Sequence, residues 1–193
     1  MRRHAAPSVK LTYDDFVRFP DDGKRHEIID GEHYVTPLPN TKHQYVSGNL
    51  FGLLWTFLDR NPVGQVFHAA FDVVFSNLDI VEPDLLYVSR QRLDILTETH
   101  VRGVPDIVVE ILSPGTKRTD ERVKRDLYER FGVREYWIVN PALDLITVYR
   151  RHDLALVMAG ELTAAREDVL ATPLLPGWSA PLMRIFAAPL SAA

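Results

Sequence analysis

Apolar residues recur at helical spacing between residues 41 and 59, which predicts a long amphipathic helix there. The positions that carry this pattern are Val46, Leu50, Leu53, Leu54, Phe57 and Leu58. The dipeptide Asn61-Pro62 ends the predicted helix. A second helix is predicted over residues 119–131, where Gly132 follows, and a short one over residues 13–19.

Most of the remaining apolar segments have strand character. The strongest is residues 105–112, PDIVVEIL, in which Ile107, Val109 and Ile111 share one face. A long strand is predicted over residues 64–76. Two short strands flank Asp30-Gly31, a dipeptide typical of two-residue hairpin turns. The other predicted strands cover residues 83–88, 135–139, 145–149 and 154–158, whereas the pattern from Leu162 onward is weak.

The order of these elements is mixed, with a hairpin and single strands interrupted by helices. This order predicts an α/β (α+β) fold in which a mixed β-sheet is flanked by helices. No linker-like segment divides the 193 residues, so we expect residues 1–193 to form a single domain. The ends, about residues 1–10 and 187–193, are expected to be flexible.

Composition places the chain among ordinary globular proteins, with 46% hydrophobic and 25% charged residues. It contains no cysteine, which excludes disulfides and thiolate metal sites and fits a reducing compartment. No secretory signal and no long apolar run is evident, so we expect a cytoplasmic protein without a membrane span. The net charge of −4 argues against a general nucleic-acid coat, but a local basic patch could still bind phosphates.

Two carboxylates stand out because they interrupt apolar strands. Glu110 lies in the middle of PDIVVEIL, and Asp84 follows Pro83 at the start of another strand. A lone Glu or Asp at such a place is more often a water-facing or turn residue. If the two strands are neighbours, however, the two carboxylates converge, and Mg²⁺ prefers such oxygen ligands. Asp106 lies too far along the strand from Glu110 to share a metal with it.

Cationic residues gather on the helix that follows this strand. Lys124 and Tyr128, four residues apart, lie beside its apolar stripe, so the lysine stem could reach Glu110. The alternative is a surface lysine, and on either reading we expect Lys124→Ala to fold nearly normally. A short basic run around it could contact phosphates or simply face solvent: Lys117, Arg118, Arg122 and Arg125.

Two earlier residues are secondary candidates, together with Tyr128. Glu27 alternates with Ile29 on the first hairpin strand, and His43 lies at the start of the long helix, on its core side. A histidine in that position is more often a core or cap residue than a ligand. Motifs for other chemistries, including GxxxxGK[ST], GxGxxG, GxSxG and HExxH, are absent from the sequence.

The sequence also resembles a known family. The segments that carry the likeness are PDIVVEILSPGTKRTDERVKRDLYERFGVREYWIVNP, RHEIIDGEHY, HQYVSGNL, EPDLLYVS and LLPGWSAPL. They resemble the Uma-type restriction endonuclease family, which is similar in fold to the PD-(D/E)xK nucleases. The resemblance covers nearly the whole chain and implies a restriction endonuclease-like fold with an additional N-terminal hairpin.

The resemblance also implies roles for individual residues. Asp84 and Glu110 would be metal ligands, and Lys124 the catalytic cation, because Leu112 stands where the common pattern has its lysine two residues after the glutamate. Glu27 and His43 match other recurring family positions. The implied function is a Mg²⁺-dependent DNA endonuclease, with Mn²⁺ as a possible substitute, and we expect a homodimer. The alternative is a catalytically inactive nuclease-fold protein that acts as a nucleic-acid-binding or regulatory module.

Overall fold

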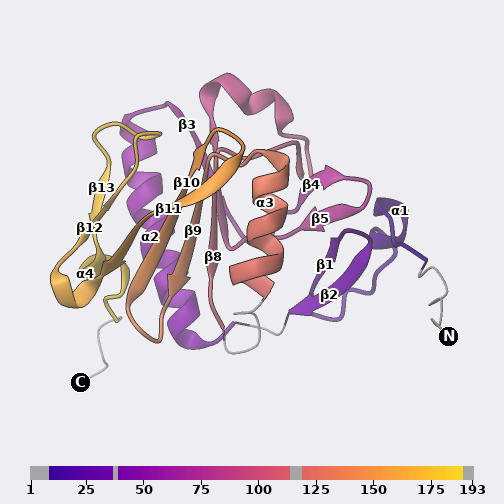
Figure 1. Ribbon diagram of the computed structural model, residues 1–193, viewed down its shortest axis with the longest axis horizontal. Coiled ribbons are helices and arrows are strands. Elements are labelled where there is room, and N and C mark those ends of the chain that lie inside the picture. The colour runs from indigo at the N-terminus through magenta and orange to yellow at the C-terminus, as the bar shows by residue number, and fades with distance from the viewer. Residues whose placement is uncertain (1–8, 37–38, 114–118, 189–193) are drawn as a thin grey trace, which may run out of the picture.

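A six-stranded sheet forms the centre of the computed structural model, which describes residues 9–36, 39–113 and 119–188 (Figure 1). Its strand order is β11-β10-β9-β8-β6-β3, and the pairing of β8 with β9 is parallel whereas its other pairings are antiparallel. The strands are β3 (Gly64–His68), β6 (Leu85–Ser89), β8 (Ile107–Ile111), β9 (Glu135–Asn140), β10 (Leu145–His152) and β11 (Ala155–Thr163). None of the described helices is long and apolar enough to cross a membrane.

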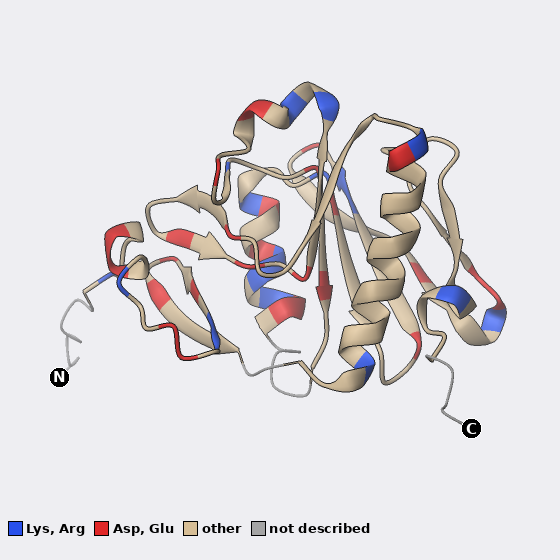
Figure 2. Cartoon of the chain, turned by 180° about the vertical axis from the view of Figure 1, so that it is seen from behind, with Lys and Arg blue, Asp and Glu red and all other residues tan. Residues whose placement is uncertain are grey.

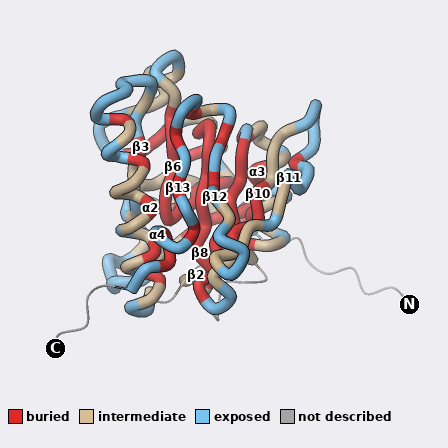
Figure 3. The backbone as a smooth tube through the Cα atoms, turned by 90° about the vertical axis from the view of Figure 1, so that its left-hand side faces the viewer, coloured by how far each residue is buried: buried red, intermediate tan, exposed pale blue. Residues whose placement is uncertain are grey.

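Helices cover both faces of this sheet, as predicted. Helix α2 (Thr41–Arg60) packs on one face and helix α3 (Arg125–Phe131) on the other (Figure 1). The alternation along β8 decides which side chains meet which helix, because Ile107, Val109 and Ile111 pack with α2. Val108 packs on the α3 side, so Glu110 faces that side too. Figure 3 shows the buried residues concentrated in these central strands.

The α2 face is also covered by the C-terminal part of the chain. There the antiparallel pair β12 (Val169–Ala171) and β13 (Ser179–Pro181) leads into α4 (Leu182–Ile185), after a 3₁₀ turn at Ala164–Arg166. Leu170, Leu175, Trp178 and Ile185 are buried in the same cluster as the apolar face of α2. The weak sequence pattern from Leu162 onward did not predict these elements.

A second, five-stranded sheet holds the N-terminal region, in the order β2-β1-β5-β4-β7. Its strands are β1 (Arg25–Ile29), β2 (Glu32–Thr36), β4 (Val73–Ser76), β5 (Asp79–Val81) and β7 (Val101–Arg102). The short helix α1 (Tyr13–Phe16) packs on it, and a 3₁₀ segment spans Arg90–Ile95. Apolar residues of β4, β5 and β7 share a core cluster with α3, so this sheet lies beside the α3 face.

The predicted strand over residues 64–76 is wrong as a single element. It divides into β3, which pairs with β6 in the central sheet, and β4, which pairs with β5 in the other. Residues 69–72 between them carry the chain from one sheet to the other. The apolar pattern is continuous across this segment, so it gave no sign that the chain changes its partner strand. The hairpin around Asp30-Gly31 is confirmed, and both turn residues have positive φ, at 51° and 74°.

The helix predicted over residues 119–131 has two parts. A π-helical turn, Thr119–Lys124, precedes α3, and Gly132 ends α3 in the left-handed region at φ 90°. Figure 1 shows α3 in front of the central sheet. This arrangement turns Lys124 and Tyr128 toward the strands, where both are buried. The chain ends predicted to be flexible lie mostly outside the described residues.

Candidate active site

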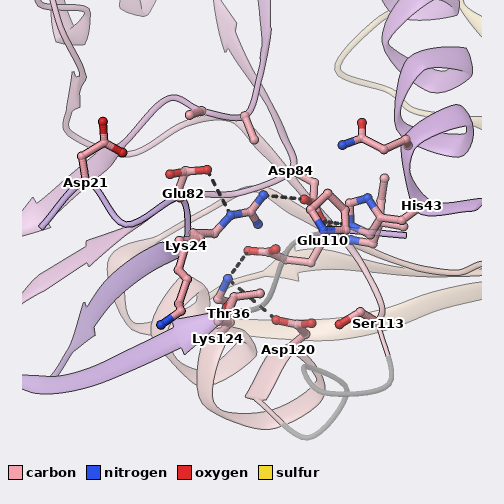
Figure 4. Close-up of a pocket in the computed structure, with 17 residues that line it drawn as sticks. Asp21, Lys24, Thr36, His43, Glu82, Asp84, Glu110, Ser113, Asp120 and Lys124 are labelled. Atoms are coloured by element: carbon pink, nitrogen blue, oxygen red, sulfur yellow. Dashed lines mark hydrogen bonds and ion pairs between the residues drawn. The ribbon is translucent and has the colours of Figure 1, made fainter. Parts of the chain in front are cut away.

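A pocket of about 460 Å³ opens where the two sheets and the N-terminus of α2 approach one another. Its walls come from the N-terminal hairpin, from the chain before β6, from the end of β8 and from the π-helical turn. Figure 4 shows the acidic residues Glu82, Asp84, Glu110 and Asp120 around it, with Lys124 and His43. Charged side chains from five distant segments are therefore brought together here.

Asp84 lies immediately before β6, beside the end of β8, and is almost fully buried. Its Oδ2 accepts the backbone N–H of Ile111 at 2.7 Å and lies 3.2 Å from His43 Nε2. Its Oδ1 accepts from Arg25 Nη2 at 3.0 Å. Burial acts to raise the pKa of Asp84. The contacts with His43, Arg25 and Ile111 have the larger effect, so the pKa of Asp84 is lowered.

Glu110 lies on β8, the strand next to β6, and lines the same pocket. Its Oε1 accepts from Lys124 Nζ at 3.0 Å and from the Tyr128 hydroxyl at 2.6 Å. Burial raises the pKa of Glu110 to about 8, and the Lys124 ammonium acts against this increase. The two residues four apart on the helix thus converge on one carboxylate oxygen.

Lys124 is enclosed by carboxylates. Its Nζ lies 2.7 Å from Glu27 Oε1, 3.0 Å from Glu110 Oε1 and 3.7 Å from Asp120 Oδ1. Burial alone lowers the pKa of Lys124, but these carboxylates outweigh it and raise the pKa above its usual value, so the side chain stays charged. The expectation that Lys124→Ala folds nearly normally rested on a side chain at the edge of the helix, and this premise is wrong because the Lys124 side chain is only 3% exposed.

The secondary candidates all contact this network. Glu27 binds Lys124 and also accepts the backbone N–H of Glu82 at 2.9 Å. His43 binds Asp84, and Tyr128 binds Glu110. The geometry therefore unites these residues with the three main candidates, whose roles stay predictions.

The described residues of the predicted basic run, Arg122 and Arg125, do not line this pocket. Arg122 and Arg125 line a separate hollow on the outer side of the helix with Tyr149, Met158 and Glu161. Arg125 pairs with its neighbour Asp126 and lies over the Tyr149 ring. Lys117 and Arg118 lie outside the described residues.

Arg25 and Glu82 are among the pocket residues that the sequence analysis missed. Arg25 Nε pairs with Glu82 Oε1 at 3.0 Å, and both side chains are largely buried. Strand alternation offered a signal, because Arg25 lies two residues before Glu27 on the same face of β1. Glu82 likewise lies two residues before Asp84.

The donors of the pocket suit a hard divalent cation. Carboxylate oxygens are the ligands that Mg²⁺ prefers, and Asp84 and Glu110 supply them from neighbouring strands. Within the described residues, the buried Oε2 of Glu27 has no hydrogen-bond partner. No described group of three or more His, Asp or Glu is arranged around a metal-sized space, however. The donor chemistry fits a cation, whereas the side chains are arranged around Arg25 and Lys124.

Comparison with known proteins gives one family match. The family model Uma2, described as "Putative restriction endonuclease", matches residues 13–183. No curated protein matches the chain. A solved structure from Anabaena variabilis ATCC 29413, described as "a putative nuclease belonging to DUF820", has a TM-score of 0.75 at 18% identity and covers 91% of this chain and 97% of its own. This likeness shows the fold, which is restriction endonuclease-like as predicted.

A more distant structural likeness covers a small part of a larger enzyme. The type IIG restriction endonuclease BpuSI has a TM-score of 0.41 at 13% identity, over 78% of this chain and 16% of its own.

Proposed function

The chain belongs to the Uma2 family, whose model is described as "Putative restriction endonuclease", and we propose that it is a Mg²⁺-dependent endonuclease that hydrolyses phosphodiester bonds in DNA. One observation carries the proposal. Lys124 Nζ lies 3.0 Å from Glu110 Oε1, and Asp84, from the neighbouring strand segment, lines the same pocket. Two carboxylates that can bind a divalent cation, with an ammonium group beside them, suit metal-assisted phosphodiester hydrolysis.

Asp84 and Glu110 would hold the divalent cation. When bound, a cation of this kind polarises a phosphoryl oxygen and lowers the pKa of bound water. The His43 contact and the Ile111 N–H fix the orientation of the Asp84 carboxylate. Tyr128 does the same for Glu110 from helix α3.

Lys124 would supply a positive charge at the scissile phosphate. Three carboxylates hold its ammonium group in place, so little reorganisation is needed when negative charge develops in the transition state. It would also serve the role that Leu112 cannot, since the leucine side chain carries no charge and lies in the apolar cluster on the α3 side of the sheet.

The partner is double-stranded DNA, and the active form is a homodimer. Two sites related by two-fold symmetry are the simplest means of cutting both strands of a duplex. Cytoplasmic location accords with a substrate of this kind.

Nicking of supercoiled plasmid tests the proposal. The purified protein should convert supercoiled plasmid to open-circular and linear forms with Mg²⁺ or Mn²⁺, and EDTA should abolish this. Asp84→Ala should lose the activity. A matched control is Asp126→Ala, which removes a carboxylate from the outer face of α3, where the Asp126 side chain is 72% exposed.

Two outcomes would count against the enzyme. Equal nicking by the wild type and Asp84→Ala would point to a contaminating nuclease. Retention of plasmid in a gel-shift assay, with no cleavage under either cation, would favour the alternative of a nucleic-acid-binding module.

A further inference from the structure

Arg25 places its guanidinium beside the pocket carboxylates Glu82 and Asp84. It is the first residue of β1, and its side chain is 15% exposed. Its guanidinium binds Asp84 Oδ1 through Nη2 and Glu82 Oε1 through Nε, both at 3.0 Å. It therefore bridges the N-terminal hairpin to the segment that precedes β6.

The contacts of Asp84 show which of its oxygens Arg25 occupies. Its Oδ2 already faces two partners, the Ile111 N–H and His43. Its Oδ1 faces Arg25. A divalent cation that binds Asp84 through Oδ1 would therefore compete with the guanidinium for that oxygen.

The surrounding charge explains why a cation is held there at all. Four buried or largely buried carboxylates meet in this region: Glu27, Glu82, Asp84 and Glu110. Within the described part of the chain, their ion pairs are with Arg25, Lys124 and His43. Buried carboxylates without a cation are costly, so Arg25 stabilises the pocket in the absence of metal.

We propose that Arg25 is an internal competitor of the metal: its guanidinium occupies Asp84 Oδ1 in the metal-free protein, and a divalent cation binds only by displacing it. This inference rests on the proposed function, since it takes Asp84 as a metal ligand. A guanidinium and a divalent cation on the same oxygen would repel each other strongly in a poorly solvated pocket. The second contact of Arg25, with Glu82, gives the displaced side chain a partner that it can keep.

Metal affinity in the absence of nucleic acid tests the proposal directly. Mn²⁺ binding is measured by electron paramagnetic resonance on the wild type, Arg25→Gln and Lys24→Gln. Lys24 is the matched control, because it lines the same pocket but pairs with Asp22 at the surface. We expect Arg25→Gln to bind Mn²⁺ about tenfold or more tightly than the wild type, and Lys24→Gln to change affinity less than about threefold. Equal or weaker binding by Arg25→Gln, or no binding by any form, overturns the proposal.

A measurement on the wild type covers the case in which Arg25→Gln does not fold. In a crystal structure with Mn²⁺, Arg25 Nη2 should lie beyond hydrogen-bond distance of Asp84 Oδ1. Mn²⁺ on Asp84 with the Arg25 contact intact, or Mn²⁺ elsewhere only, contradicts displacement.

These results are separable from those of the plasmid assay. If the wild type cleaves plasmid and Arg25→Gln binds Mn²⁺ no more tightly than the wild type, Arg25 is not a competitor of the metal, but the proposed nuclease activity stands. Displacement of Arg25 without any cleavage supports the competitor and argues against the nuclease.

Discussion

Lys124 is held by Glu27, Glu110 and Asp120 in the interior of the protein. Lys124→Ala would leave these carboxylates without their shared cation, and breaking a buried ion pair in this way costs about 3–5 kcal/mol of unfolding free energy. Urea unfolding should therefore show a large fall in stability. Lys24→Ala is the control, because Lys24 is 56% exposed and its loss should cost less than about 0.5 kcal/mol.

A fall of similar size in the two variants would contradict the burial argument. The stability loss also governs how activity is tested. Lys124→Ala should be assayed at a temperature where it is fully folded, and activity that survives there undiminished would exclude Lys124 from catalysis.

Asp72 provides a pH-dependent prediction outside the contacts of the candidate metal ligands. It lies between β3 and β4, and burial, followed by the nearby charge of Glu27, raises the pKa of Asp72 to about 6. The folded protein therefore holds a proton on Asp72 more tightly than the unfolded chain, whose carboxyl has its usual pKa near 4. Stability contributed by this proton is present below about pH 4 and is lost as the pH rises through about 6.

Asp72→Asn should remove the loss of stability that the wild type undergoes as the pH rises. Because Asp72 is only partly buried, solvent screening reduces the effect, and we expect a gain of about 1 kcal/mol at pH 7 relative to the wild type. Urea unfolding at pH 4 and pH 7 measures it. The prediction fails if the variant has the same advantage, or none, at both pH values.

The β1–β2 hairpin is the element that carries Arg25 and Glu27 into the pocket. Its turn requires Gly31, which has φ 74° and whose position for a Cβ lies 2.5 Å from the Lys10 side chain. Gly31→Ala should therefore destabilise the hairpin by about 1–2 kcal/mol, through backbone strain and the contact with Lys10. Thermal unfolding measures the loss.

Gly48 on the exposed side of α2 is the opposite control. A Cβ there meets nothing within 4 Å, and the backbone is helical. Gly48→Ala should stabilise the protein by about 0.5–1 kcal/mol. If Gly31→Ala and Gly48→Ala destabilised the protein equally, the positive φ of Gly31 would not explain the loss of stability.

Elements with strong local patterns were predictable, and those that depend on distant partners were not. Helix α2 was predicted to within one residue, because its apolar residues form a regular stripe that packs on one face of the sheet. The strand break between β3 and β4 was missed, since both halves are apolar and only their partners differ. The short strands β5 and β7 gave too few residues for a periodic signal.

The candidate site follows the same division. Strand alternation predicted the face on which Glu110 lies, and a carboxylate on an apolar strand is visible in sequence. The contact of Asp84 with Arg25 spans 59 residues and depends on how the hairpin packs against the central sheet. No local pattern encodes that packing, so Arg25 and Glu82 emerged only from the structure.

For the whole molecule, the net charge of −4 limits how the proposed DNA substrate could bind. Figure 2 shows both Lys or Arg and Asp or Glu along many of the described elements. Attraction to the phosphate backbone must therefore be local, and the acidic pocket repels it until cations neutralise the carboxylates. Because attraction by one copy is weak, two copies bound together would make more contacts with a duplex than one.

The proposed homodimer gives the last prediction, on the products of cleavage. Sedimentation at micromolar concentration should show a species of twice the 22.0 kDa chain mass. Under these conditions plasmid should pass rapidly to the linear form, because the two sites of a dimer would each cut one strand. Mixing the wild type with excess Asp84→Ala should form mixed dimers with one competent site, so open circles should accumulate instead. A monomer at this concentration, or linear product that the inactive variant leaves unchanged, would contradict a two-fold cleavage mechanism.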